Sequence, residues 1–285
     1  MLTKNTIEIF AVTMSKMLSL QIPPQQSGKV HSKFKNGLNV QFGDNLLYIG
    51  ALGTPLSAFG MLVTKADLIQ LLDNIQVGEI VISKDKRFVF YTTQGIINLE
   101  YINVEYVDLG IPNIKYSIEK IANNKLYAHL SGLELDKRTG MTLDDREKKY
   151  IARLITTSKE DYQENLEIIK FFTGRGIGLT PSGDDLLLGF SFALRIFNQG
   201  ACWLLCMRKI TAQQLTTPIS IAYAQALLSG YVSLNCLNLA LVLDTQDTEK
   251  IKTVVDDVAA FGYTSGYDTL YGFWLGLCFL INYKK

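Results

Sequence analysis

The chain has 285 residues, 48% of them hydrophobic, and its formal net charge is +1. A chain of this length can bury one large core or two modest ones. Because the charges are mixed, without a basic stripe or an acidic tail, we predict neither a nucleic-acid partner nor a membrane partner. The first residues lack the basic start and the cleavage site of a signal peptide, so we expect a cytoplasmic protein.

The first half of the chain is rich in predicted strands. We expect an opening helix over 2–20 and a loop over 23–28. Runs of β-branched and aromatic residues then predict strands over 38–42, 46–50, 58–63, 79–83, 87–92 and 95–107. Gly43-Asp44-Asn45 and Lys84-Asp85-Lys86 predict turns between strands, and Thr64 with Asp67 predicts a capped helix.

The second half, from about residue 141, is helical in pattern. Helices are predicted over 143–156, 159–172, 183–197, 201–214, 217–230, 231–243, 247–261 and 266–281. Thr142 and Ser158 are expected caps, and several helices are apolar all round, which is typical of the centre of a bundle. Glycines in these helices (Gly189, Gly272 and Gly276) allow neighbouring helices to approach closely.

These patterns predict an α+β chain with two domains. Residues 1–138 form a β-rich domain, either a sheet or a small barrel, and residues 139–285 form a helical bundle. The apolar stretches 221–243 and 269–283 are interrupted by polar residues or are shorter than the roughly 20 residues of a spanning helix. We expect both to be buried helices.

One pattern occurs twice, as GRGIGLTPSGDD over 174–185 and GYTSGYDTLYGF over 262–273. Ser182 precedes Asp185, and Ser265 precedes Asp268, by the three residues of a capping box. Capping explains these four residues without a ligand. It explains neither Asp184 nor the glycines of the first segment, which are Gly174, Gly176, Gly178 and Gly183.

A ligand site explains the remaining residues of the pattern. Glycine directly after a capping serine leaves the free N–H groups of a helix start unshielded, and such a start attracts anions. Asp184 beside it favours a ligand that also carries an amide, an amine or a metal ion. Two such helix starts in one bundle could face a single pocket. A purely structural glycine cluster is the alternative.

Three further residues are weighed as parts of the site. Arg175 is the candidate cation for an anionic ligand, with a solvent-facing arginine as an equal alternative. Thr217 stands at another helix start, where ordinary capping by Thr217-Pro218 is favoured. His31 could supply a general acid or base, although a lone histidine near a loop is more often incidental.

The known cofactor motifs are absent from the sequence. There is neither a Rossmann fingerprint nor a phosphate-binding P-loop. The four cysteines (Cys202, Cys206, Cys236 and Cys278) lie in apolar sequence and are expected to be buried thiols. No metal site is predicted, and Mg²⁺ is left open as a bound ion.

The stretch GIGLTPSGDDLLLGF closely resembles the signature G-x-G-L-T-P-S-G-D-D-x-L-x-G of a bacterial family long catalogued as a domain of unknown function. One branch of that family is a subunit of oxamate carbamoyltransferase, which acts in anaerobic allantoin and purine degradation. Three other stretches also look like blocks of the family, namely HSKFKNGLN, TTPIS and GYTSGYDTLYGFWLGL.

The resemblance implies a subunit of a transferase that converts oxalurate and phosphate into oxamate and carbamoyl phosphate, or catalyses the reverse. A small anion would be the substrate, and other subunits would be the partners. Asp184, Asp185 and Asp268 are the expected catalytic residues. The expected substrate-binding residues are Arg175, Gly176, Gly178, Thr180, Ser182, Gly183, Thr264, Ser265, Gly266, His31 and Thr217.

Two other functions stay open at this point. The paired aspartates could serve a Mg²⁺-dependent phosphotransferase that acts on a small acid. Alternatively, the chain could be a non-catalytic subunit whose glycine-rich face docks a partner. A homo-oligomer is also open.

Overall fold

The structure, a computed structural model, describes residues 5–114, 116–157 and 161–282. The chain divides into two compact units, Met1–Leu109 and Gly110–Lys285. Strands dominate the first unit and helices the second, so the predicted α+β class is confirmed. The predicted domain boundary, between residues 138 and 139, lies within the second unit, and a division there stays a prediction.

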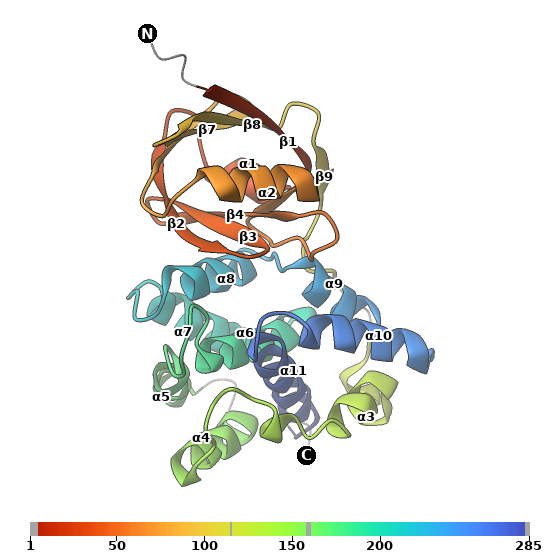
Figure 1. The fold of residues 1–285 in the computed structure, drawn as a ribbon. Coiled ribbons are helices and arrows are strands. Elements are labelled where there is room, and N and C mark those ends of the chain that lie inside the picture. Colours follow the sequence, from red (N-terminus) through yellow and green to blue (C-terminus); the bar gives the residue numbers. More distant parts are fainter. Residues whose placement is uncertain (1–4, 115, 158–160, 283–285) are drawn as a thin grey trace. The chain divides into compact units, whose positions relative to one another are not determined.

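The first unit is a small barrel, shown in red to yellow in Figure 1. Eight strands follow one another in the order β5-β4-β3-β2-β6-β7-β8-β1, and pairing between β1 and β5 closes the ring. The ninth described strand, β9, pairs with β1. The strands are β1 (Asn5–Ser15), β2 (Ser27–Phe34), β3 (Gly37–Phe42), β4 (Asn45–Ala51), β5 (Gly60–Val63), β6 (Ile80–Lys84), β7 (Arg87–Thr92), β8 (Gly95–Glu100) and β9 (Glu105–Val107).

Local sequence signals set the turns of the barrel. Phe42 pairs with Asn45 across a two-residue turn, in which Gly43 has a φ of 58°. A second tight turn joins β6 to β7. The helix α2 (Lys65–Asn74) begins at the predicted cap, where the Thr64 hydroxyl accepts a hydrogen bond of 3.1 Å from the Asp67 N–H. These predictions are confirmed.

The predicted opening helix over 2–20 is wrong. The described part of this segment is strand β1, followed by the short helix α1 (Leu18–Gln21). Ile9 and Ala11 are buried while Phe10 and Val12 are exposed, and this alternation of period two belongs to a strand. Strand β2 was also missed, because its start was assigned to the loop over 23–28.

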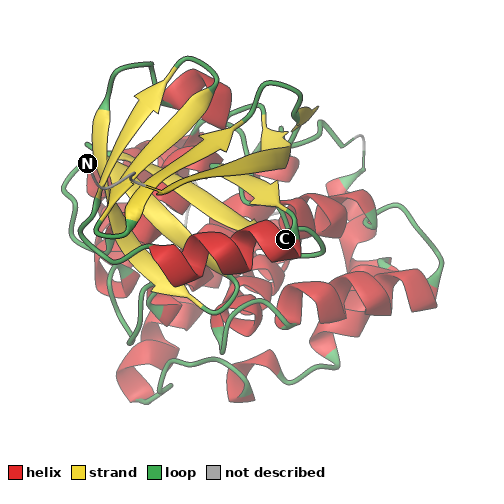
Figure 2. Cartoon of the chain, turned by 45° about the horizontal axis from the view of Figure 1, so that its top comes forward, coloured by secondary structure: helices red, strands yellow, loops and turns green. Residues whose placement is uncertain are grey.

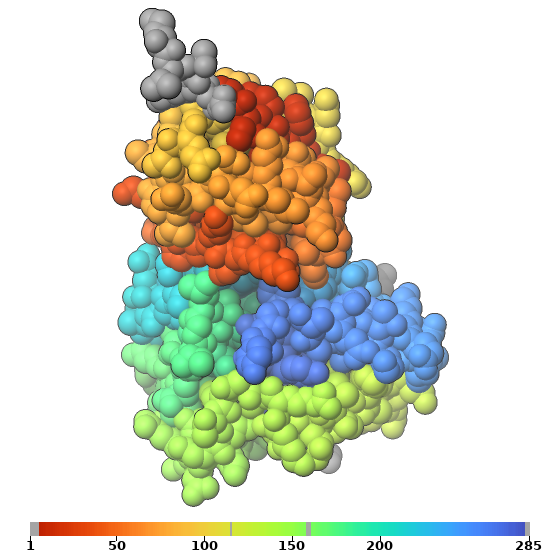
Figure 3. Space-filling view, in the orientation of Figure 1, coloured from red at the N-terminus to blue at the C-terminus, as the bar shows by residue number. Residues whose placement is uncertain are grey.

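The second unit is a helical bundle (Figure 2). Its helices are α3 (Lys125–Ser131), α4 (Asp145–Thr156), α5 (Tyr162–Phe172), α6 (Ser182–Ile196), α7 (Ala201–Thr211), α8 (Pro218–Leu228), α9 (Leu234–Leu241), α10 (Thr248–Ala259) and α11 (Ser265–Asn282). The 3₁₀ helices η1 (Ile118–Asn123) and η2 (Leu135–Lys137), like α3, were not predicted. Figure 3 shows the yellow-green segment that contains α3 and α4 along one face of this unit.

Helices α6 and α11 form the centre of the bundle. A Cβ atom on Gly189 or Gly272 would come closer than 3.0 Å to a backbone oxygen of the other helix, so only glycine allows this approach. Leu186 lies against Gly272, and Ala193 lies against Gly276. The two helices therefore run in the same direction, and their first residues lie together. The predicted close approach through glycine is confirmed.

Two predicted caps need correction. Helix α4 begins at Asp145, and its cap is Asp144, which accepts from two N–H groups of the first turn, rather than Thr142. Helix α5 is capped by Asp161, while Ser158 lies outside the described residues. Among the described residues, no helix has both the length and the hydropathy needed to span a membrane.

Candidate functional site

The two repeated segments meet in space. The Thr180 hydroxyl oxygen lies 2.7 Å from that of Ser265, which joins the loop before α6 to the start of α11. Gly140 lies between the same helix starts, because a Cβ atom there would press against the hydroxyls of Ser182 and Thr264. Gly140 is exposed, so the cluster begins directly beneath the surface of this unit.

The predicted capping boxes at these helix starts are wrong. Helix α6 begins at Ser182, and its cap residue, Pro181, makes no side-chain capping bond. Helix α11 begins at Ser265. Each aspartate therefore stands a full turn inside its helix, where the side chain turns to the core. Asp185 is 5% exposed and Asp268 is 0% exposed.

At each helix start, the glycine N–H that was expected to be free is occupied. The Gly183 N–H donates to the Arg175 carbonyl at 2.8 Å, and the Gly266 N–H donates to the Phe261 carbonyl at 2.9 Å. A Cβ atom on either glycine would collide with the carbonyl at the end of the preceding helix. Close packing of the chain's own backbone therefore explains why glycine occurs at both positions.

Unpaired donors lie instead in the loop that precedes α6. The backbone N–H groups of residues 176–180 donate to no group among the described residues. Gly176 and Gly178 have φ angles of 115° and 97°, a backbone region that favours glycine. Residues 176–179 are exposed, and a row of such N–H groups is a structure that binds anions.

Asp184 fastens this loop to the bundle. One carboxylate oxygen accepts the Gly174 N–H at 2.8 Å, and the other accepts the Thr216 hydroxyl. Burial raises the pKa of Asp184, while the hydrogen bonds from Thr216, Gly174 and Ser220 act to lower it. This carboxyl is thus largely committed to holding the loop.

Asp185 and Asp268 both keep an uncommitted oxygen. The Oδ2 atom of each is buried and has no hydrogen-bond partner among the described residues. The other oxygen of Asp268, Oδ1, accepts from the Thr139 hydroxyl and, at 2.9 Å, from the Gly140 N–H. Buried polar atoms without a partner are uncommon and costly, and they often mark functional sites.

Burial raises the pKa of Asp185 well above its usual value of 3.8. The Ser265 and Thr180 hydroxyls act to lower that pKa, and the charges of Asp268 and Asp184 act to raise it. Two like charges close together in a buried place cannot both be stable. Burial and the neighbouring charges thus favour the protonated form of Asp185, which is the form that can donate a proton.

Two small cavities flank Asp185. Their volumes are about 30 Å³ and about 20 Å³. Since one water molecule needs roughly 10 to 15 Å³, each cavity has room for no more than three waters. No lysine, arginine or histidine of the described chain lines either cavity.

The structure places Arg175 beside this loop, where its guanidinium is already engaged. It donates to the Phe171 carbonyl at 3.0 Å and to the Glu147 carboxylate at 2.8 Å, and it lies 4.0 Å from the centre of the Phe171 ring. An interaction of Arg175 with an anionic ligand stays a prediction.

Thr217 and His31 have other environments. Thr217 caps α8, accepting from the Ser220 N–H at 3.1 Å, and its hydroxyl donates to the Leu179 carbonyl. The favoured interpretation as an ordinary cap is confirmed. His31 lies on β2 of the barrel, where its Nδ1 atom is 3.1 Å from the Ser32 hydroxyl. A role for His31 in catalysis stays a prediction.

Sequence reasoning missed two residues of the cluster. Thr139 and Gly140 lie where the predicted second domain begins, and nothing in their local sequence points to Asp268. In the part of the chain that the structure describes, no three His, Cys, Asp or Glu side chains are arranged to hold a metal ion.

The comparison with protein families bears on these same segments. A family model described as oxamate carbamoyltransferase subunit AllH matches residues 172–277, which include both repeated segments and all three aspartates. No solved structure matches the chain. Over residues 172–277, the match supports the resemblance to this family that is seen in the motif.

Proposed function

We propose that this chain is a subunit of an enzyme of the oxamate carbamoyltransferase type and contributes the starts of α6 and α11 to its active site. One observation carries the proposal. Asp185 and Asp268 form a buried carboxyl pair, each with an unpartnered oxygen, inside the segment that matches the family. The family supports the role of a subunit, and the pair suggests which atoms contact the substrate.

Carbamoyl transfer makes three demands on such a site. An oxygen of phosphate attacks the ureido carbonyl carbon of oxalurate, and the bond from that carbon to the oxamate nitrogen breaks. The products are carbamoyl phosphate and oxamate, whose nitrogen takes up a proton. The enzyme must hold two anions, accept amide N–H groups and supply that proton.

The residues present can meet these demands. Asp268 Oδ2 accepts an N–H of the substrate, and Asp185, which retains its proton because it is buried, donates that proton to the departing nitrogen. The unpaired N–H groups of residues 176–180 bind carboxylate or phosphate oxygens. Opening of this loop admits the substrate to the pair.

The small volume of the cavities favours a second candidate function. A face whose pockets have room for only a few waters also suits a non-catalytic subunit that docks a partner. No observation on the described residues supports the third function, a Mg²⁺-dependent phosphotransferase.

The test uses the enzyme assembled with its other subunits. The rate of carbamoyl phosphate formation from oxalurate and phosphate is measured for the wild type and for Asp185→Asn and Asp268→Asn. We expect each variant to assemble normally and to lose at least about 100-fold in kcat, the usual worth of a positioned acid or base.

Asp256→Asn is the matched control, because Asp256 is an exposed aspartate on α10 that pairs with Lys252. It should retain the full rate. If the two site variants assemble normally and also retain the full rate, the catalytic proposal is wrong and the docking function replaces it.

A further inference from the structure

The segment between η2 and α4 forms a third side of the site. Thr139 and Gly140 lie before the residues that match the family, and nothing has assigned them a role. Both donate to the same atom, Asp268 Oδ1. The Thr139 hydroxyl also accepts from the Met141 N–H at 3.2 Å, and this bond fixes the position of the hydroxyl.

These two bonds fix the orientation of the carboxylate. If Asp268 rotated about its side-chain bonds, both donors on Oδ1 would lose their acceptor inside a buried site, which is costly. Oδ2 is therefore held in one direction, and it has no partner among the described residues. A fixed acceptor beside a group that can donate matches the N–H and C=O groups of a primary amide.

We infer that Thr139 is a positioning residue, which acts with the Gly140 N–H to hold Asp268 so that Oδ2 selects a small acid bearing an amide over one bearing a second carboxylate. The inference rests on the proposed function and adds its basis for substrate recognition. Oxamate and oxalate test it directly, because they differ only in that an amide replaces one carboxylate. A second carboxylate would turn a negative oxygen toward Oδ2 and be repelled.

The first experiment is calorimetric titration of the full chain with oxamate and with oxalate. We expect the wild type to prefer oxamate. Thr139→Val keeps the shape of the side chain and removes the hydroxyl, and it should weaken oxamate binding about tenfold while changing oxalate binding less than about twofold. Thr139→Ser restores the hydroxyl and should restore the preference.

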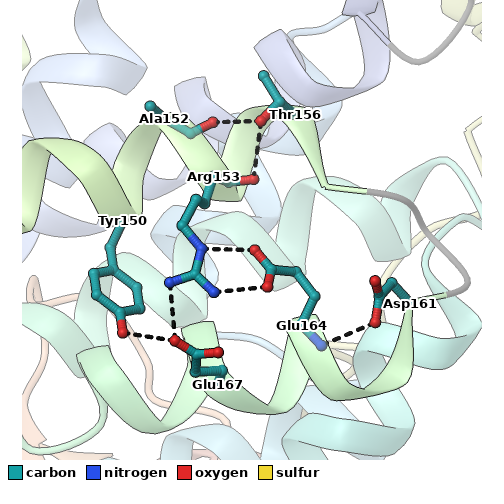
Figure 4. Close-up of polar contacts among 7 residues, drawn as sticks. All are labelled: Tyr150, Ala152, Arg153, Thr156, Asp161, Glu164 and Glu167. Carbon is teal, nitrogen blue, oxygen red and sulfur yellow. Dashed lines mark hydrogen bonds and ion pairs between the residues drawn. The ribbon is translucent and has the colours of Figure 1, made fainter.

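The control is Thr156→Val. The Thr156 hydroxyl also forms hydrogen bonds, but to Ala152 and Arg153 of its own helix on the exposed face of α4, as Figure 4 shows. This variant should bind both ligands as the wild type does. An unchanged preference for oxamate in a folded Thr139→Val protein would overturn the inference and leave the proposed function standing.

The second experiment needs no ligand. Carboxyl ¹³C NMR of the full chain, with aspartate labelled, follows the titration of Asp185, which is assigned by its loss in Asp185→Asn. Because the charge of Asp268 acts on Asp185, a change in the position of Asp268 should move this titration in Thr139→Val and not in Thr156→Val. An unmoved titration overturns the inference even if the chain alone binds neither acid.

Discussion

The starts of α6 and α11 repeat one sequence pattern and share one design. Gly183 and Gly266 donate to carbonyls of the preceding loops, and Asp185 and Asp268 each stand one turn inside a helix with a buried, unpartnered oxygen. The difference lies in what surrounds each aspartate. Asp268 is held by two donors from residues 139 and 140, whereas Asp185 borders both cavities.

The neighbouring position extends this contrast. Where α6 has Asp184, which fastens the glycine-rich loop, α11 has Tyr267, whose hydroxyl accepts from exposed Arg138 at 3.0 Å. The copy at α6 thus carries a loop with unpaired N–H donors, whereas the copy at α11 is held in place by residues 138–140. A repeated pattern can build two equivalent positions in a core and still give them different chemistry.

The largest expected effect tests the close backbone packing that the starts of α6 and α11 share. Gly183→Ala and Gly266→Ala each place a Cβ atom against a backbone carbonyl that has no room to move. We expect each to lower the free energy of unfolding by about 3 kcal/mol, the upper range for overpacking. Urea unfolding followed by tryptophan fluorescence measures this, since both tryptophans, Trp203 and Trp274, lie in the helical unit.

Gly132→Ala is the control for this pair. Gly132 has a φ of −81°, and a Cβ atom there would meet its nearest neighbour at an ordinary 3.5 Å. Its stability should match that of the wild type. A large loss for only one of the two site glycines would show that the two helix starts are not packed alike.

The next effect separates the two aspartates. Asp268→Asn leaves one amide oxygen to accept from the two donors, but it weakens both charge-assisted bonds and buries an NH₂ group where Oδ2 has no partner, so it should lower the free energy of unfolding by about 2 kcal/mol. Asp185→Asn replaces a carboxyl whose protonated form is favoured by burial with a neutral group of the same shape, so it should cost less than Asp268→Asn. Equal losses in the urea experiment would mean that the two carboxyls are held alike.

The sequence predicted the parts of this molecule that depend on neighbours along the chain. The turn at Gly43, the cap at Thr64 and the glycines between α6 and α11 follow from the preferences of a few residues. The first strand was missed because its partners, β5 and β8, lie far along the chain. The residues of β1 alternate between buried and exposed, but the stretch also contains good helix formers. Its sequence alone therefore does not indicate that it pairs with β5 and β8.

The site was predictable in its residues and not in its contacts. The repeated motif identified Asp185 and Asp268, which the structure brings together. It did not show that carbonyls occupy the N–H groups of Gly183 and Gly266, since that depends on how the preceding helices end. Thr139 could not be found, because it is 129 residues from Asp268 in the chain and its local sequence resembles an ordinary loop.

A smaller effect concerns pH. Because the pKa of Asp185 is raised in the folded state, that state binds the proton more tightly than the unfolded chain does. The contribution of this group to stability is complete below the unfolded value, near 3.8, and is lost as the pH rises through the folded value. Asp184, whose pKa is also raised, adds to the same trend.

The measurement is the free energy of unfolding at several pH values above 4. Asp185→Asn removes the titrating group, so the difference in stability between the variant and the wild type should shift in favour of the variant as the pH rises. Asp268→Asn takes away the neighbouring charge and should weaken this pH dependence of Asp185. A constant difference between Asp185→Asn and the wild type at all pH values would contradict the protonated state assigned to Asp185.

The smallest expected effect concerns ion pairs on the helices that come before α6 and α11 in the chain. Arg153 of α4 binds both oxygens of Glu164 at 2.6 and 2.7 Å and Glu167 at 2.9 Å, which ties α4 to α5, the helix that precedes the glycine-rich loop and α6 (Figure 4). On the α11 side, Lys252 and Asp256 form an exposed pair within α10. A bidentate arginine network is worth more than one such exposed pair.

Arg153→Gln should therefore lower the free energy of unfolding by about 1 kcal/mol, the upper end for partly exposed pairs. Lys252→Gln, the matched control, should produce no measurable change. Hydrogen exchange of the α5 amides, which precede the glycine-rich loop, should rise in Arg153→Gln while that of α11 stays as in the wild type. If Arg153→Gln changed the amide hydrogen exchange of α5 and α11 equally, these two helices would be equally rigid. The difference between the two helix starts would then lie in the glycine-rich loop alone.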